Sequence, residues 1–253
     1  MKKRIFLFAI IIGLIVFITL FSSKDVKIIQ TMAVPVTNKI IVVDAGHGKP
    51  DSGAENESGI SEEAINLKIA LKLQKFLESS GAIVLLTRSD ENGIYEIDSK
   101  TISQKKVSDI KNRVKIANDA SADIYVSIHL NKIPQGQYWG WQTFYNTRNE
   151  KSKLLADSIQ KNLNDIISGE NKRETKKLDS IYIMKNVEIP IALVECGFLS
   201  NEQEAQKLTQ DDYQSKLAWG IYDGIMDYFN LKWNNFYCYP NIKRKLWNIK
   251  SKI

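Results

Sequence analysis

The feature that most constrains the fold is an apolar run that leads into a histidine flanked by glycines. Residues 40–43 read Ile-Ile-Val-Val, and Asp44-Ala45-Gly46-His47-Gly48 follows directly. Four consecutive apolar, mostly β-branched residues are typical of a central strand that is covered on both faces. The glycines beside His47 allow a sharp backbone turn and leave room for the imidazole ring. The segment therefore predicts a buried strand that carries a histidine at its carboxyl end.

Two further apolar runs also end in side chains that can bind a metal or a proton. Residues 123–129 end in His129 and residues 189–195 end in Glu195, and the whole chain contains only two histidines. Because open α/β sheets build their sites at the carboxyl ends of parallel strands, we expect His47, His129 and Glu195 to lie together. The alternative is that these are ordinary residues at the ends of strands.

Helical patterns separate the strand-like runs. Residues 82–86 form another short apolar run, and residues 142–145, 182–184 and 189–195 are expected to be strands. Residues 152–163 are expected to be helical, and residues 166–177 to be a polar connection. Ser61 is a candidate N-cap, Gly81 a stop signal, and residues 200–203 have the spacing of a capping box. Three apolar faces recur with helical spacing: Ile65, Ile69, Leu73 and Leu77; Val107, Ile110, Val114 and Ala117; and Leu217, Ile221, Ile225 and Tyr228.

This alternation predicts the fold class. We expect a single α/β domain over residues 39–231, with a mainly parallel or mixed central sheet and helices on both faces. The site is expected at the carboxyl ends of the strands.

The two ends of the chain differ in character from the domain. Residues 1–23 begin with Lys2-Lys3-Arg4 and continue with an apolar run over residues 5–21, which predicts either an uncleaved membrane anchor or a removed signal peptide. The protein is therefore expected to be extracytoplasmic, either anchored in the membrane or secreted. Residues 24–38 are expected to be a linker. The tail, residues 232–253, mixes aromatic and basic side chains, which suits either an anionic membrane surface or packing on the domain.

Charge and cysteine content exclude several classes. The net charge is +6, but the basic excess lies in residues 1–4 and in the tail, so the domain is not expected to bind nucleic acid. Cys196 and Cys238 are too few for a cysteine-rich zinc site. They either form a disulfide or leave Cys196 as a buried free thiol. A transition metal would therefore be held by histidines and carboxylates.

A catalytic zinc ion normally has three protein ligands, so we expect a carboxylate as the third ligand beside His47 and His129. Glu62 is favoured because it lies in the first turn of a helix, where Asn66 could orient it, although spacing alone hardly separates it from Glu63. The other acidic candidates are Asp44, Asp51, Glu55 and Glu57. Glu195 would then be free to act as the general base. The sequence contains no HExxH, G-x-S-x-G or Walker motif.

Five motifs in order resemble the type-3 family of zinc-dependent N-acetylmuramoyl-L-alanine amidases. They lie at residues 44–48, 62–67, 86–88, 127–131 and 194–201. The resemblance implies one zinc ion per chain, held by His47, Glu62 and His129, and a catalytic Glu195. It favours Glu62 over Glu63 by its distance from Leu67. Within the same motifs, Arg88 and Asn131 become candidates, with Asn66, for supporting the ligands or contacting substrate.

The implied reaction is hydrolysis of the amide between the lactyl group of N-acetylmuramic acid and L-alanine in peptidoglycan. Residues 139–145 and the short layout are similar to members of the family that prepare muramic-δ-lactam in the spore cortex. Lys49-Pro50 departs from the family, which usually has glycine after the His-Gly pair. The alternatives are a non-catalytic or partner-activated wall-binding protein with the same fold, and another zinc hydrolase that acts on wall polymers. A possible activator protein belongs to the expected partners.

Overall fold

The computed structural model describes residues 34–167, 169 and 171–231. The segments expected to be an N-terminal anchor and a basic aromatic tail lie outside these residues, as do most of the expected linker and Cys238. Cys196 is fully buried and forms no disulfide with another described residue, so its pairing with Cys238 stays open. Val36, in the last part of the expected linker, is also fully buried in the core, so the folded unit begins before residue 39.

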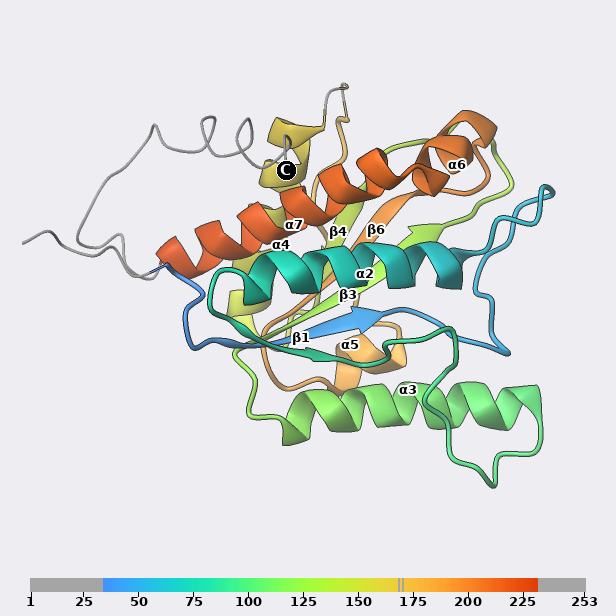
Figure 1. The fold of residues 1–253 in the computed structure, drawn as a ribbon, viewed down its shortest axis with the longest axis horizontal. Helices are drawn as coiled ribbons and strands as arrows, with labels where there is room; N and C mark the ends of the chain where they lie inside the picture. The colour runs from blue at the N-terminus through green and yellow to red at the C-terminus, as the bar shows by residue number, and fades with distance from the viewer. Residues whose placement is uncertain (1–33, 168, 170, 232–253) are drawn as a thin grey trace, which may run out of the picture. The chain divides into compact units, whose positions relative to one another are not determined.

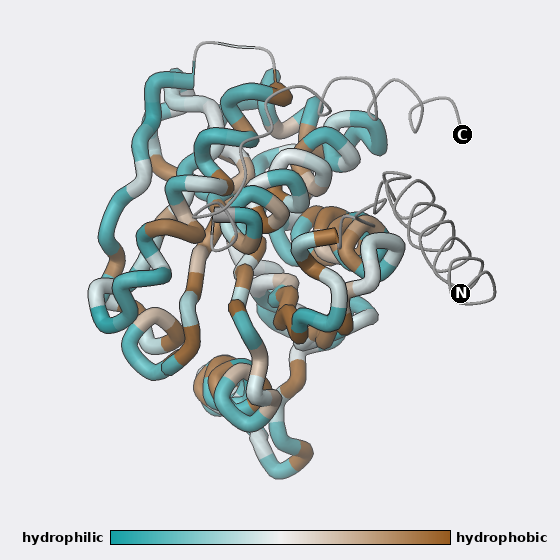
Figure 2. The backbone as a smooth tube through the Cα atoms, turned by 90° about the vertical axis from the view of Figure 1, so that its left-hand side faces the viewer, coloured by the Kyte–Doolittle hydropathy of each residue, from teal (hydrophilic) through white to brown (hydrophobic). Residues whose placement is uncertain are grey.

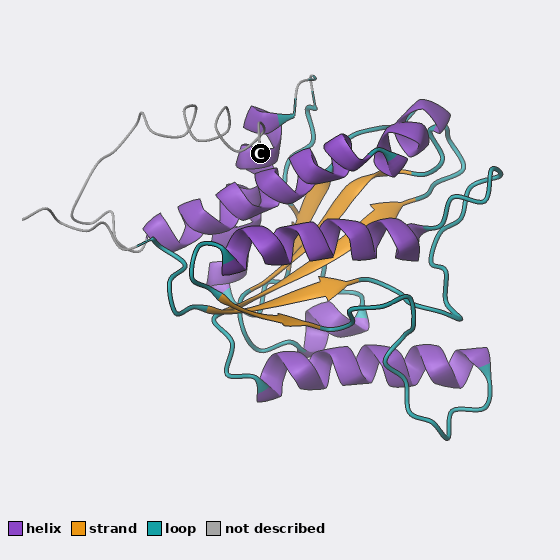
Figure 3. Ribbon diagram, viewed as in Figure 1, coloured by secondary structure: helices purple, strands orange, loops and turns teal. Residues whose placement is uncertain are grey.

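A six-stranded mixed sheet forms the centre of the fold (Figures 1 and 3). Its strands lie in the order β2-β1-β3-β6-β4-β5. The first four of these are parallel to one another, β4 runs antiparallel to β6, and β5 runs parallel to β4. The carboxyl ends of β1, β3 and β6 therefore meet at one edge, as the sequence predicted. The strands are β1 (Ile40–Ala45), β2 (Ile83–Leu86), β3 (Ile124–Asn131), β4 (Gln142–Tyr145), β5 (Lys176–Lys177) and β6 (Ile191–Phe198).

Helices cover both faces of this sheet. On one face lie α2 (Glu62–Glu78), α4 (Glu150–Ile166), α6 (Glu202–Thr209) and α7 (Asp211–Leu231). On the other lie α3 (Ile102–Asp119) and the short α5 (Tyr182–Asn186). Figure 1 shows α2 and α7 above the strands and α3 below them. The hydrophobic stretches, brown in Figure 2, run through the middle of the fold between the helical layers.

The core of the larger face confirms two of the three predicted apolar stripes. The four predicted residues of α2 and the four of α7 are each no more than 4 % exposed. Burying a large aliphatic side chain contributes about 1.5–3 kcal/mol, so these stripes hold both helices on the sheet. In α3 the stripe is confirmed only in its second half: Val114 and Ala117 are buried, but Val107 is 50 % exposed. Figure 1 shows the reason, because the first half of α3 extends past the ends of the strands.

Three local predictions were wrong in detail. Residues 182–184 were expected to be a strand, but they open α5, which packs against α3. The Asn118 side chain of α3 donates to the carbonyl of Asn186, and that contact stabilises the helical turn. The cap of α6 is Asn201 rather than Ser200, since the Asn201 side chain accepts from the amide of Glu204. The connection 166–177 ends in the two-residue strand β5. Within the described residues, none of the helices combines the length and the apolar character needed to cross a membrane.

Candidate metal centre and catalytic site

His47 stands just past the end of β1, in a backbone conformation that is uncommon for a residue other than glycine. Its φ is +61°, in the left-handed region, and the flanking Gly48 also has a positive φ of +147°. The amide of Gly46 donates to the carbonyl of Ile128, which ties this turn to the neighbouring strand β3. The turn thus carries the imidazole from the end of β1 toward β3.

His129 reaches the same point from β3. Its ring centroid lies 5.1 Å from that of His47, and the two rings are nearly perpendicular. The ring fills the space in front of Gly46, where a Cβ would stand 2.5 Å from Nε2 of His129. Any larger residue at position 46 would therefore clash with the ring of His129 in its present position.

Glu62 lies between the two histidines. Its Oε1 is 3.0 Å from Nδ1 of His129 and 3.3 Å from Nε2 of His47, and it accepts from the amide of Leu130 at 2.9 Å. Its Oε2 accepts from the amide of Ala54 at 2.8 Å. The residue is 3 % exposed. Burial alone would raise the pKa of this carboxyl, but the hydrogen bonds and charges of both histidines outweigh it and hold the pKa well below its usual range.

These three residues form a donor set that suits a zinc ion. One ligand atom from each of His47, Glu62 and His129 lies within 4.8 Å of the others. Two imidazoles and one carboxylate are a common ligand set of catalytic zinc, and they leave a coordination position open. Glu63, the competing residue on the same helical turn, is not part of this group: its carboxylate accepts from the Ser61 hydroxyl at 3.4 Å, and its main-chain carbonyl accepts from Arg88.

The electrostatics of the site favour a cation. Burial opposes protonation of His47, but Asp51 and Glu62 outweigh it and raise the pKa of His47 to about 9. Nδ1 of His47 lies 3.0 Å from Oδ2 of Asp51, and Lys106 approaches the other oxygen of Asp51 at 2.8 Å. A carboxylate on the second ring nitrogen orients a histidine ligand and increases its basicity. The residues present therefore fit a bound divalent metal.

Glu195 lies beside this group on β6. It is the register partner of His129, so the two side chains belong to the same edge of the sheet. Its Oε2 is buried and has no hydrogen-bond partner among the described residues. Burial raises the pKa of Glu195 to about 7, against the lowering effect of the histidines. A carboxyl group that titrates near neutrality can both accept and release a proton, and a cation bound nearby would lower this pKa.

Buried arginines hold the turn that carries His47. Arg113 of α3 donates to the carbonyls of Ala45 and His47 and pairs with Asp44. Arg88 donates to the carbonyls of Ala45, Gly46 and Asp90, and to that of Glu63 in α2. Both side chains are no more than 4 % exposed, so they act on the position of the turn.

The remaining predicted residues have different surroundings. Asn66 donates to the carbonyl of Gly46 at 3.2 Å and to Oε1 of Glu62 at 3.4 Å, which is the orienting geometry expected for it. Asn131 is half-buried at the end of β3, and its carbonyl accepts from the amide of Leu199. Its contact with substrate stays a prediction, as does that of Arg88.

Sequence reasoning missed the roles of Asp51 and Arg113. The sequence suggests Asp51 only as a candidate metal ligand. Arg113 falls on the same helical face as Ile110, Val114 and Ala117, and that position on an apolar stripe was the available signal of a buried charge.

Comparisons with known proteins agree with this geometry. Residues 41–227 match the family described as N-acetylmuramoyl-L-alanine amidase. The chain is 38% identical over 240 residues to the germination-specific N-acetylmuramoyl-L-alanine amidase of Bacillus subtilis (strain 168), covering 92% of this chain and 98% of that protein.

Solved structures show the same fold. The CwlD amidase from Clostridioides difficile, in complex with the GerS lipoprotein, is similar with a TM-score of 0.75 and 46% identity, over 77% of this chain and all of that one. An N-acetylmuramoyl-L-alanine amidase from Clostridium difficile 630 is similar with a TM-score of 0.67 and 29% identity, over 77% of this chain and 98% of that one.

Proposed function

The chain belongs to the N-acetylmuramoyl-L-alanine amidase family, and from this premise we propose that it is a zinc-dependent hydrolase whose metal is held by His47, Glu62 and His129. Its activity is cleavage of the amide between N-acetylmuramic acid and L-alanine in peptidoglycan. The observation that carries the proposal is that Oε2 of Glu195, buried on the strand position paired with His129, has no hydrogen-bond partner among the described residues.

The proposed mechanism assigns proton transfer to Glu195. A zinc ion held by the three ligands would supply Lewis-acid chemistry, because it polarises the amide carbonyl and makes water a better nucleophile. Glu195 takes a proton from the attacking water, whose oxygen bonds to the lactyl carbonyl carbon. The C–N bond then breaks, and Glu195 delivers the proton to the departing nitrogen. The products are a lactyl carboxylate and a peptide with a free L-alanine amino group.

The other residues of the site keep this constellation in place. Asp51 orients His47, Asn66 orients Glu62, and Arg113 fixes the backbone of the turn after β1. General acid–base catalysis by one side chain contributes typically about 10²–10⁴-fold. The matched test compares wild type with Glu195→Gln on purified peptidoglycan with added zinc, reading new L-alanine amino termini. We expect loss of activity in the variant with unchanged zinc content; equal activity in both would contradict the role of Glu195.

We further propose that the substrate is spore-cortex peptidoglycan, where this cleavage precedes formation of muramic-δ-lactam. The likeness to a germination-specific amidase over nearly its whole length supports this. The chain, produced in Bacillus subtilis that lacks its germination-specific amidase, should restore muramic-δ-lactam to the cortex. Spores without the lactam, despite active protein, would contradict the cortex role.

A partner protein and an extracytoplasmic location complete the proposal. A structural relative forms a complex with a lipoprotein, and we propose that a lipoprotein also binds this chain and activates it. The apolar run over residues 5–21 would anchor the enzyme to the membrane, outside the cytoplasm. Purified GerS lipoprotein is the probe: co-elution with this chain and a rise in amidase activity are expected, and separate elution with unchanged activity would contradict it.

A further inference from the structure

Arg173 lies between aromatic rings, next to the carboxyl end of β6. Its guanidinium carbon is 4.6 Å from the ring centroid of Phe198 and 5.8 Å from that of Tyr138. Its Nε donates to the carbonyl of Trp139 at 3.1 Å. Stacking on aromatic faces together with this bond fixes the plane of the guanidinium group. The two terminal nitrogens are thus presented in a defined direction.

A side-chain contact connects this arginine to the strand pair that contains Glu195. Nη1 of Arg173 lies 3.4 Å from Oε1 of Gln142, and Gln142 is the antiparallel register partner of Glu195. Directly opposed residues of an antiparallel pair project from the same face, about 4.5–5.5 Å apart at Cβ. Gln142 therefore links Arg173 to the face that carries the proposed catalytic carboxylate.

An irregularity in β6 brings Phe198 to the same side. Glu195 is opposite His129, whereas Phe198 is opposite Asn131, so β6 has one residue more than β3 over this stretch. Such a bulge reverses the usual alternation, and residues 195 and 198 project from the same face. The Phe198 ring that stacks with Arg173 therefore lies on the face of β6 that carries Glu195.

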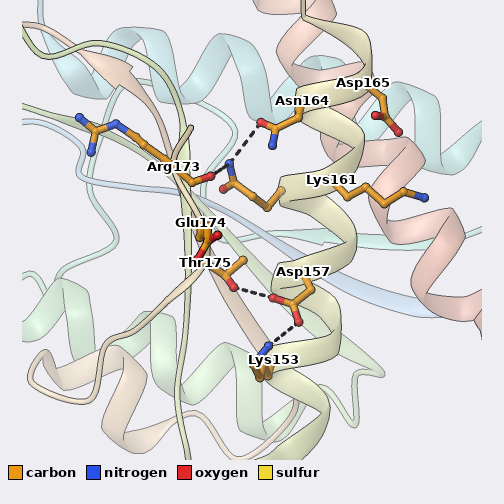
Figure 4. A pocket seen from close by; sticks show the side chains of 9 residues that line it. Lys153, Asp157, Lys161, Asn164, Asp165, Arg173, Glu174 and Thr175 are labelled. Atoms are coloured by element: carbon orange, nitrogen blue, oxygen red, sulfur yellow. Dashed lines mark hydrogen bonds and ion pairs between the residues drawn. The ribbon is translucent and has the colours of Figure 1, made fainter. Parts of the chain in front are cut away.

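The charge of Arg173 has no carboxylate within ion-pair distance among the described residues. Glu204 is close enough to be influenced by it, but the oxygens of Glu204 accept from the amides of Gly140 and Phe198. Figure 4 shows the Arg173 side chain directed away from Lys161 and Asp165 of α4. Among the residues that the structure describes, the guanidinium is therefore held in place by its ring and amide contacts and has no carboxylate paired with it.

We propose that Arg173 binds a carboxylate of the stem peptide, the first one that follows the alanine released by cleavage; this subsite rests on the proposed amidase function. In the intact substrate the lactyl carboxyl is consumed in the amide and the glycan units are uncharged, so the anionic groups belong to the peptide. A guanidinium fork matches a carboxylate with two parallel hydrogen bonds. Tyr138 and Trp139, 44 % and 43 % exposed, flank the arginine and offer a surface for the peptide.

Two peptides test the proposal without requiring turnover. The stem tripeptide with a free α-carboxylate on its second residue is compared with the same tripeptide carrying a carboxamide there, by calorimetry on the full zinc-loaded chain. Wild type should bind the carboxylate form on the order of tenfold more tightly or better, which is the range of a charge-assisted pair. Arg173→Gln should remove this preference, and Arg173→Lys should restore part of it.

Arg148→Gln is the matched control, because this arginine follows β4 at the end opposite to Glu195 and also donates to a backbone carbonyl, that of Lys185. It should leave the preference unchanged. Three results would overturn the proposal. Wild type could bind both peptides with equal affinity, or Arg173→Gln could lose affinity for both peptides equally. The third is that neither peptide binds at millimolar concentration. Amidase activity is measured in parallel, so a chain that discriminates the peptides but releases no alanine amino termini would refute the proposed function and support the subsite.

Discussion

Replacing Gly46 with alanine tests the packing of the proposed metal centre without removing any of the proposed ligands. The φ of Gly46 is not in the left-handed region, so an alanine can adopt this backbone without strain. The new Cβ would stand 2.5 Å from Nε2 and 2.8 Å from Nδ1 of His129. Ordinary contacts of a Cβ lie at 3.4–4 Å, so the imidazole has to move.

The size of this movement sets the expected loss. The ring must shift by about 1 Å to reach a normal contact distance, in a core that is closely packed. Metal–ligand distances tolerate deviations of only about 0.2 Å, so His129 would no longer serve as a ligand in its present position. Disturbing residues that only support a ligand already costs about 10–100-fold in metal affinity. We therefore expect Gly46→Ala to weaken zinc binding by at least about 100-fold, or about 2.7 kcal/mol.

The assay is competition for zinc with a chromophoric chelator, together with thermal unfolding of the zinc-free protein. Gly59→Ala is the control, because a Cβ there meets nothing within 4 Å although its φ is +76°. That variant should lose about 1–2 kcal/mol of stability and keep its zinc affinity. If Gly46→Ala binds zinc as tightly as wild type, the placement of His129 beside Gly46 is not a requirement of the metal centre and the reasoning fails.

Three further predictions follow from the same contacts. Glu62→Gln should abolish tight zinc binding while Glu63→Gln keeps it, as measured by metal content after dialysis; the reverse result would reassign the ligand. Asp51→Asn should lower zinc affinity by about 10–100-fold, with activity recovered at high zinc, and an unchanged affinity would exclude its orienting role. Burial alone would raise the pKa of Asp44, but its arginine partner outweighs burial and the pKa is lowered from 3.8 to about 2. Because the pKa is lower in the folded state than in the unfolded state, the ionised carboxylate stabilises the fold by about 2 kcal/mol above pH 4. This stabilisation is lost as the pH falls toward 2. Urea unfolding should show the gap between wild type and Asp44→Asn closing over that interval, whereas a constant gap would contradict the shift.

The parts of the fold that were predictable are those fixed by local periodicity. Apolar runs that end in His47, His129 and Glu195 identified three central strands, and parallel topology alone brings their ends together. The strand expected at residues 182–184 failed for a tertiary reason: the same apolar residues serve a helical turn once α3 offers Asn118 as a partner. Short apolar segments carry no signal that separates these outcomes.

The site was predictable in its ligand types and in the support that Asn66 gives to Glu62, but not in its other supporting contacts. Two adjacent acidic residues occupy the first turn of α2, and only the packing of that helix decides that Glu62 faces the histidines. Asp51 lies in a loop rich in turn formers, where the sequence fixes no direction for a side chain. Arg88 was expected either to support the ligands or to contact substrate, and its bonds to backbone carbonyls, including those of Ala45 and Gly46, agree with the supporting role.

The measurement that tests the central claim most directly is zinc X-ray absorption on the purified, zinc-loaded chain, which reports the metal content and the atoms bound to the metal. We predict one zinc ion per chain coordinated by two imidazole nitrogens and carboxylate or water oxygens, and an altered nitrogen count in His129→Ala. A sulfur ligand, or a zinc environment unchanged in His129→Ala, would contradict a centre built from His47, Glu62 and His129.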